Sequence, residues 1–163
     1  MKKVAIIAAL AYFLVLCEFA LYNTFGPWGK PELLILLFVF FNLYMGIRYS
    51  IIAAVVCGLL KDSLGISPFG TYLFVYVAGA YWTTFVSKYI YQPGSRFSRA
   101  IVAFFVVLGC FVLEIALHRM EHDIHFGEAF TYVIWPQLVT TMVLATFVFH
   151  RLRDVSVLCH LKD

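Results

Sequence analysis

The chain has 163 residues, of which 63% are hydrophobic and only 13% are charged, and its formal net charge is +3. A soluble domain has roughly 45–50% apolar and about 25% charged residues, so this composition excludes a soluble domain and indicates an integral membrane protein. The 12 Lys and Arg residues are scattered rather than gathered into a basic patch, which argues against nucleic acid as a partner.

Apolar runs along the chain predict an all-α membrane protein, a single compact bundle of six transmembrane helices in one domain over residues 1–163. The first run follows Lys2 and Lys3 and continues to about Leu21 without a small-x-small cleavage site, so we interpret it as an uncleaved span rather than a secretory signal. The second helix is predicted to begin with Pro31 in its first turn and Glu32 near the positive end of the helix dipole. The predicted helices cover about residues 4–23, 31–46, 50–64, 70–89, 99–117 and 126–149.

The third predicted helix is short for a membrane span. Residues 50–64 reach roughly 22 Å, whereas the hydrocarbon core is about 30 Å thick. This helix is therefore shallow on one side, extended at its start, or continued by the irregular segment that follows. Irregular backbone at that depth must be covered by protein or must face water, because lipid cannot satisfy its polar groups.

The distribution of basic residues predicts the orientation. Six spans place both termini on one side of the membrane, and nine of the 12 basic residues fall on that side, while Lys30, Lys61 and Arg119 fall on the other. Because cytoplasmic loops are enriched in Lys and Arg, both termini are predicted to be cytoplasmic. The nine residues are Lys2, Lys3, Arg48, Lys88, Arg96, Arg99, Arg151, Arg153 and Lys162.

Lys61 and Asp62 lie at the end of an apolar run and are followed by the turn-forming residues Gly65, Pro68 and Gly70. Charged residues in such a run are candidates for function. Adjacent residues point about 100° apart on a helix, so the two side chains are expected to serve different partners. Asp62 is predicted to accept backbone N–H groups of the following turn, a structural role that we favour over contact with a substrate.

Glu18 and Glu114 are acids within the first and fifth predicted spans. A proton relay or a cation site is one interpretation, and hydrogen bonds between helices are the one we favour. His118, His122 and His125 carry zinc-ligand side chains, but His118 is followed by Arg119 where the HEXXH motif has Glu, so a solvated loop is favoured over a metal site. The sequence predicts neither a catalytic site nor a cofactor.

Two further features concern contacts between helices. Ala5 and Ala9 form a small-xxx-small pair on the first helix, which allows another helix to approach closely. Pro136 followed by Gln137 predicts a kink in the sixth helix that lines a cavity or shapes a contact with another helix.

Four segments carry a resemblance to a known family. They are Pro31–Leu37 (PELLILL), the connection Arg48-Tyr49, Gly58–Gly70 (GLLKDSLGISPFG) and Lys88–Tyr91 (KYIY). Over nearly the full chain, this pattern resembles the MreD family, small membrane subunits of the bacterial rod-shape (elongation) machinery. The family typically shows a GLLxDLLSGxPLG-like run, and Gly65-Ile66 stands here where many members have Ser-Gly, so the turn register differs slightly.

The resemblance implies a scaffold without catalytic activity in the bacterial inner membrane, where it is surrounded by lipid. It implies binding to an MreC-like single-span protein and, through the complex, to an MreB-like filament, RodA and its transpeptidase. A second copy of the chain is a further candidate partner.

The family also resembles the substrate-binding S components of energy-coupling-factor vitamin transporters, which supplies the alternative function. S components dock through small-residue pairs like Ala5 and Ala9. They also need polar groups around an outward cavity, for which Glu18, Glu114, Gln137 and the outer loops qualify.

Overall fold

The computed structural model describes residues 2–25, 31–64, 68–91, 96–121 and 135–145, and nearly all of them are helical. The predicted all-α fold is therefore confirmed for this part of the chain. A further helix covers residues 135–145. The five labelled helices are α1 (Lys2–Phe25), α2 (Leu33–Met45), α3 (Ile47–Leu64), α4 (Thr71–Ile90) and α5 (Arg96–Glu121).

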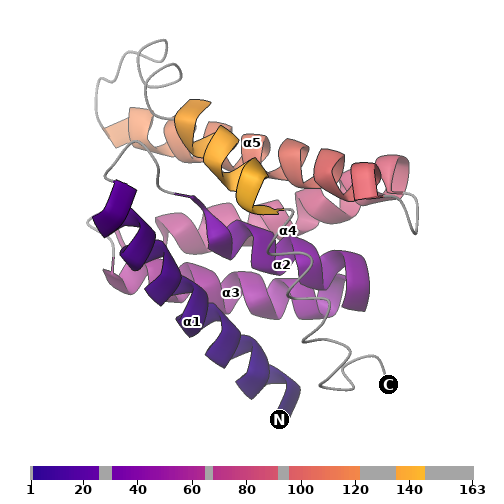
Figure 1. Cartoon of the computed structure of the whole chain (residues 1–163), viewed down its shortest axis with the longest axis horizontal. Helices are drawn as coiled ribbons and strands as arrows, with labels where there is room; N and C mark the ends of the chain where they lie inside the picture. The colour runs from indigo at the N-terminus through magenta and orange to yellow at the C-terminus, as the bar shows by residue number, and fades with distance from the viewer. Residues whose placement is uncertain (1, 26–30, 65–67, 92–95, 122–134, 146–163) are drawn as a thin grey trace.

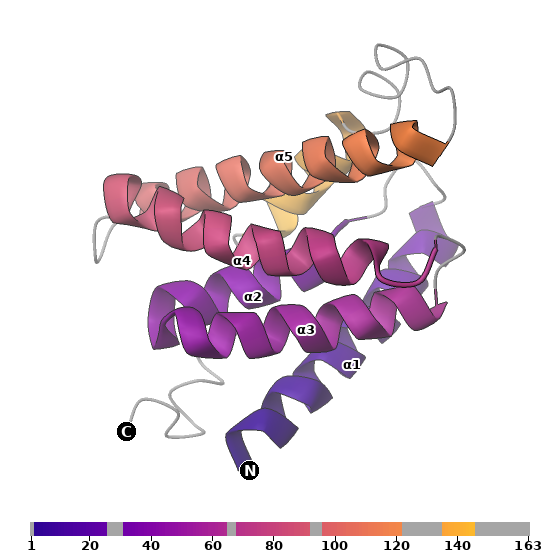
Figure 2. The same cartoon turned by 180° about the vertical axis from the view of Figure 1, so that it is seen from behind.

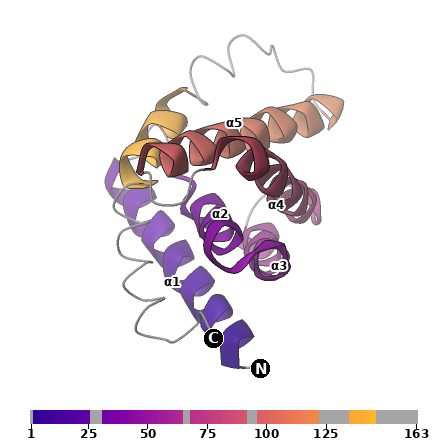
Figure 3. The same ribbon diagram turned by 90° about the vertical axis from the view of Figure 1, so that its right-hand side faces the viewer.

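Helix α2 lies at the centre of the bundle and packs against α1, α3, α4 and α5 (Figure 1). Every residue from Leu33 to Asn42 is buried. A helix that is apolar on all sides, as this LLILLFVFFN segment is, must be surrounded by other helices. Helices α3 and α4 run side by side along it, α5 packs mainly on α4, and α1 crosses obliquely at the edge (Figures 2 and 3).

Helix α2, and not α3, is the short helix of the bundle. Helix α3 begins at Ile47, before the predicted Ser50, and its 18 residues reach roughly 27 Å. The sequence left three possibilities for this helix: a shallow side, an extended start, or continuation by the irregular segment. The structure shows the extended start. The 13 residues of α2 reach only about 20 Å, and its start is buried inside the bundle.

The predicted start of α2 is wrong by two residues. Pro31 and Glu32 precede the helix in non-helical, buried backbone, and Glu32 is the N-cap residue. Its carboxylate makes no capping hydrogen bond, because it pairs with Lys61 instead. The other described helices begin and end within four residues of the predicted bounds. Of the predicted helix 126–149, residues 135–145 are described.

Two described helices are long and apolar enough to cross a membrane, namely Val4–Asn23 within α1 and Phe97–Leu117 within α5. Their mean hydropathies are 2.5 and 2.8. Both expose large apolar side chains, among them Phe13 and Phe19 of α1 and Phe105 and Val112 of α5. Such surfaces are suited to lipid or to another helix.

Candidate functional site

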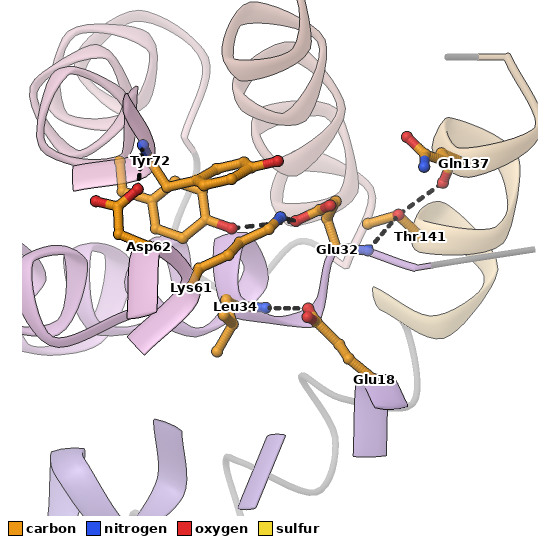
Figure 4. A network of polar contacts seen from close by, with 9 residues as sticks. Glu18, Glu32, Leu34, Lys61, Asp62, Tyr72, Gln137 and Thr141 are labelled. Atoms are coloured by element: carbon orange, nitrogen blue, oxygen red, sulfur yellow. Dashed lines mark hydrogen bonds and ion pairs between the residues drawn. The ribbon is translucent and has the colours of Figure 1, made fainter. Parts of the chain in front are cut away.

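A buried ion pair joins Lys61 of α3 to Glu32 at the start of α2. The Lys61 ammonium donates to Glu32 Oε2, and the two side chains are only 8% and 5% exposed. The hydroxyl of Tyr76 on α4 donates to the same oxygen over 3.1 Å. Figure 4 shows the Lys61 side chain of α3 pointing toward Glu32 at the start of α2. Because two charges lose their hydration when buried, such a pair is tolerated only with this kind of additional hydrogen bond.

Two tyrosine rings complete the surroundings of the Lys61 ammonium. Its nitrogen lies 4.4 Å from the ring centre of Tyr72 and 5.5 Å from that of Tyr76. The two tyrosines are four residues apart and therefore share one face of α4. A cation over an aromatic face is attracted by the ring quadrupole, most strongly away from water. This face of α4 thus holds Lys61 toward Glu32.

The backbone N–H groups at the buried start of α2 donate to side chains of two other helices. The Glu32 N–H donates to Thr141 Oγ1 over 3.1 Å, and the Leu34 N–H donates to Glu18 Oε1 over 3.1 Å. The Thr141 hydroxyl in turn donates to the carbonyl of Gln137 over 2.6 Å. A helix start inside an apolar bundle needs such acceptors, and a carboxylate also matches its positive dipole end. The interhelical hydrogen bond favoured for Glu18 is therefore confirmed.

Asp62 likewise accepts the backbone N–H groups at the start of α4. Its carboxylate accepts the N–H groups of Gly70, Tyr72 and Leu73 over 3.1, 3.0 and 3.1 Å, which confirms the predicted acceptor role. Gly70 has φ +103°, a conformation that favours glycine. At Gly58 a Cβ atom would lie 2.6 Å from the Cα of Leu73, so α3 and α4 approach each other closely here. Lys61 and Asp62 thus serve different partners, as expected from their angular separation.

Lys61 makes its ion pair with Glu32, and Glu114 is half-buried on α5. Every buried side-chain nitrogen or oxygen in the described part of the chain has a hydrogen-bond partner. Within the described ranges, no group of three His, Cys, Asp or Glu side chains is placed to hold a metal ion. This arrangement is suited to fixing helices relative to one another.

The remaining predicted residues lie outside this cluster. Gly65 is beyond the described residues, and Pro68 is exposed, with its carbonyl accepting the N–H of Thr71 over 3.2 Å. Ala5 and Ala9 are exposed on α1. The structure therefore does not bring the alanine pair to the polar residues.

Pro136 lies in the first described turn of the helix 135–145, and its carbonyl accepts the hydroxyl of Thr140 over 3.0 Å. Gln137 contributes its backbone carbonyl to Thr141, as above. The predicted kink involves residues before 135, and these lie outside the described part, as do His122 and His125.

Three members of the site were not predicted from the sequence, namely Glu32, Tyr76 and Thr141. The pairing of Glu32 with Lys61 could have been predicted, since a lone cation in an apolar bundle needs an anion. Glu32 was predicted to lie on the same side of the membrane as Lys61. Tyr76 is one of several tyrosines on its helix, and Thr141 is 109 residues from the N–H that it accepts. Nothing in the local sequence distinguishes these two.

Comparison with known proteins identifies the family. No curated protein and no solved structure matches the chain, so the likeness to transporter S components, and the function it suggested, find no support. The family of rod shape-determining protein MreD, however, matches residues 2–155, nearly the whole chain and including every member of the site. This family comprises bacterial membrane proteins with a role in rod-shape determination and is not a known enzyme family. The chain therefore belongs to the MreD family of rod shape-determining proteins.

Proposed function

We propose that the chain is a six-span scaffold of the cell-elongation complex in the bacterial inner membrane. The observation that carries this proposal is the polar network of Glu18, Glu32, Lys61, Tyr76 and Thr141. It links α1, α2, α3, α4 and the helix 135–145 at one end of the bundle. A network whose groups are all used in mutual contacts favours a rigid support over a catalyst.

The arrangement of charges supports an orientation with both termini in the cytoplasm. The N-terminus of α1, the α2–α3 turn, the end of α4 and the start of α5 lie toward one end of the bundle (Figure 1). Exposed Arg48 and Lys88 are at this end, whereas the buried Lys61 is at the other. By the positive-inside rule, the first end faces the cytoplasm.

The outer face of α1 is the surface that we assign to an MreC-like single-span partner. Helix α1 packs on α3 and α2 through one side, which includes Ile7, Ala11 and Val15. The other side exposes Ala5 and Ala9 together with the larger Tyr12, Phe13 and Leu16. Small residues allow two helix backbones to approach closely, and large apolar neighbours add contact area. Through this partner the scaffold would connect an MreB-like filament with RodA and its transpeptidase.

Co-purification in mild detergent tests this proposal. We expect the wild-type chain to retain a tagged MreC-like partner and the double variant Ala5→Leu/Ala9→Leu to lose most of it. The matched control is Ala100→Leu/Ala116→Leu, which enlarges two exposed alanines of α5. A wild-type chain that retains no partner would contradict the scaffold. Equal retention by the α1 variant would contradict the assigned surface alone.

A further inference from the structure

The end of the bundle opposite the polar network carries a second cluster of side chains, which we call the basic end. It consists of Arg48 in the first turn of α3, Lys88 in the last turn of α4, and Arg99 in the first turn of α5, together with Tyr44 and Tyr91. These elements meet on the right-hand side of Figure 1. The rod-shape function proposed above makes no use of this cluster.

Contacts between three helices hold the basic end together. Asn42 Nδ2 donates to the carbonyl of Ala80 over 3.1 Å and to Thr84 Oγ1 over 2.8 Å, which fixes α2 against α4. Lys88 lies one turn beyond Thr84, toward the same end. Arg99 Nη1 donates to the hydroxyl of Tyr44, which fixes α5 against α2. Arg48 follows four residues after Tyr44, across the turn at Gly46.

Arg99 is partly buried, and its guanidinium contacts the phenol of Tyr44. Burial raises the pKa of Tyr91, the nearby Tyr44 raises it further, and Arg99 opposes both effects. The guanidinium has five N–H donors, of which Tyr44 accepts one, so a forked donor set remains for an anion.

The basic end has no acidic partner among the described residues. The acidic residues whose side chains the structure describes are Glu18, Glu32, Asp62 and Glu114, and all four lie in the half of the bundle nearer the other end. The ion pair found in the described part joins Lys61 to Glu32. Three basic residues at the neighbouring ends of three helices, with no acidic side chain described at that end, make it complementary to a negatively charged ligand.

Exposed aromatic side chains favour a membrane lipid as the ligand. Tyr89 and Phe97, which flank the cluster on α4 and α5, are 73% and 83% exposed. Aromatic side chains are enriched at the height of the lipid headgroups, where their rings contact acyl chains. An acidic segment of a soluble protein would satisfy the charges but would leave these rings in water.

We propose that the basic end is a binding site for the headgroup of an anionic phospholipid. Arg99, oriented by Tyr44, binds the phosphodiester through paired N–H groups, a geometry in which guanidinium is particularly effective. Arg48 and Lys88 add charge from the two sides, as in other basic sites between transmembrane helices. Tyr89 and Phe97 contact the acyl chains.

The purified full-length chain in a neutral detergent provides the test. We expect added phosphatidylglycerol to remain bound in native mass spectrometry and to raise the melting temperature, and phosphatidylcholine to do neither. The variant Arg99→Gln should weaken phosphatidylglycerol binding by roughly fivefold, the effect of one charge at a membrane surface. Because Arg99 also contacts Tyr44, the exposed pair Arg48→Gln/Lys88→Gln serves as a second variant and should weaken binding by about 25-fold.

The control Lys2→Gln/Lys3→Gln removes the same net charge from the start of α1 and should leave binding unchanged. Equal binding of the two lipids would overturn the proposal, and so would wild-type binding by the Arg48→Gln/Lys88→Gln variant. Displacement of the lipid by a polyglutamate peptide would also overturn it, because the site would then be one for an acidic protein segment.

Discussion

Replacing Glu32 by Gln removes the anion that neutralises Lys61 while keeping the size of the side chain and an acceptor for Tyr76. The charge of Lys61 then remains buried beside two tyrosine rings, without its ion-pair partner. Breaking a buried pair by removing one partner costs about 3–5 kcal/mol, because the other charge is left uncompensated. We therefore expect this cost for Glu32→Gln. For Lys61→Met we expect a cost near the lower limit, because Glu32 keeps the hydrogen bond from Tyr76.

The double variant Lys61→Met/Glu32→Gln distinguishes an ion pair from two independent contributions. Replacing both members of a buried pair with neutral groups of similar volume is often close to neutral. We expect the double variant to be less destabilised than either single variant. The coupling free energy should then be at least about 3 kcal/mol, the upper limit of the usual range for residues in direct contact.

Reversible unfolding in mixed micelles of neutral detergent and dodecyl sulfate, followed by tryptophan fluorescence, measures these free energies. Lys88→Met is the matched control, since it removes an exposed lysine at the end of α4 and should change stability by less than about 0.5 kcal/mol. If the costs of the two single changes simply add in the double variant, the Lys61–Glu32 pair is not the interaction that fixes α3 to the start of α2.

Three further changes probe the neighbouring contacts by the same measurement. Asp62→Ala should cost about 2–3 kcal/mol and impair rod shape in a complementation assay, because three N–H groups lose a charged acceptor; wild-type stability would contradict the assigned role. Gly58→Ala should cost about 1–3 kcal/mol by pushing α3 from α4, whereas the control Gly109→Ala meets only a side chain and should be near neutral; equal costs would refute close packing at Gly58. Glu18→Ala should cost about 1–3 kcal/mol by leaving the Leu34 N–H unsatisfied, and Glu18→Gln should restore most of it; failure of this rescue would assign the effect to charge.

The part of the site that is local in sequence could be predicted. Asp62 is followed within eight residues by Gly70, and an acid before a glycine-containing turn has nearby N–H groups to accept. Its separation from Lys61 follows from helix geometry alone. The resemblance of residues 58–70 to the family run pointed to the same segment, and the family match confirms that resemblance.

The long-range part could not be predicted, because it depends on which helices are neighbours. The partner of Lys61 is 29 residues away, and the Thr141 hydroxyl reaches the N–H of a residue 109 positions earlier. The predicted start of α2 was also wrong, because it relied on the preference of proline for the first turn of a helix. The pairing of Glu32 with Lys61 determines that boundary instead, which is a tertiary effect.

The short central helix explains why this membrane protein contains so many buried polar groups. Because α2 reaches only about 20 Å, its start lies inside the bundle, where no water is available to its free N–H groups. Each acceptor supplied to these groups comes from another helix, so satisfying α2 also fixes α1 and the helix 135–145 in position. Asp62 fixes α4 to α3 in the same way. The charged residues that first suggested chemistry are therefore best understood as the contacts that make one end of the bundle rigid, and a partner bound on α1 would be held on that support.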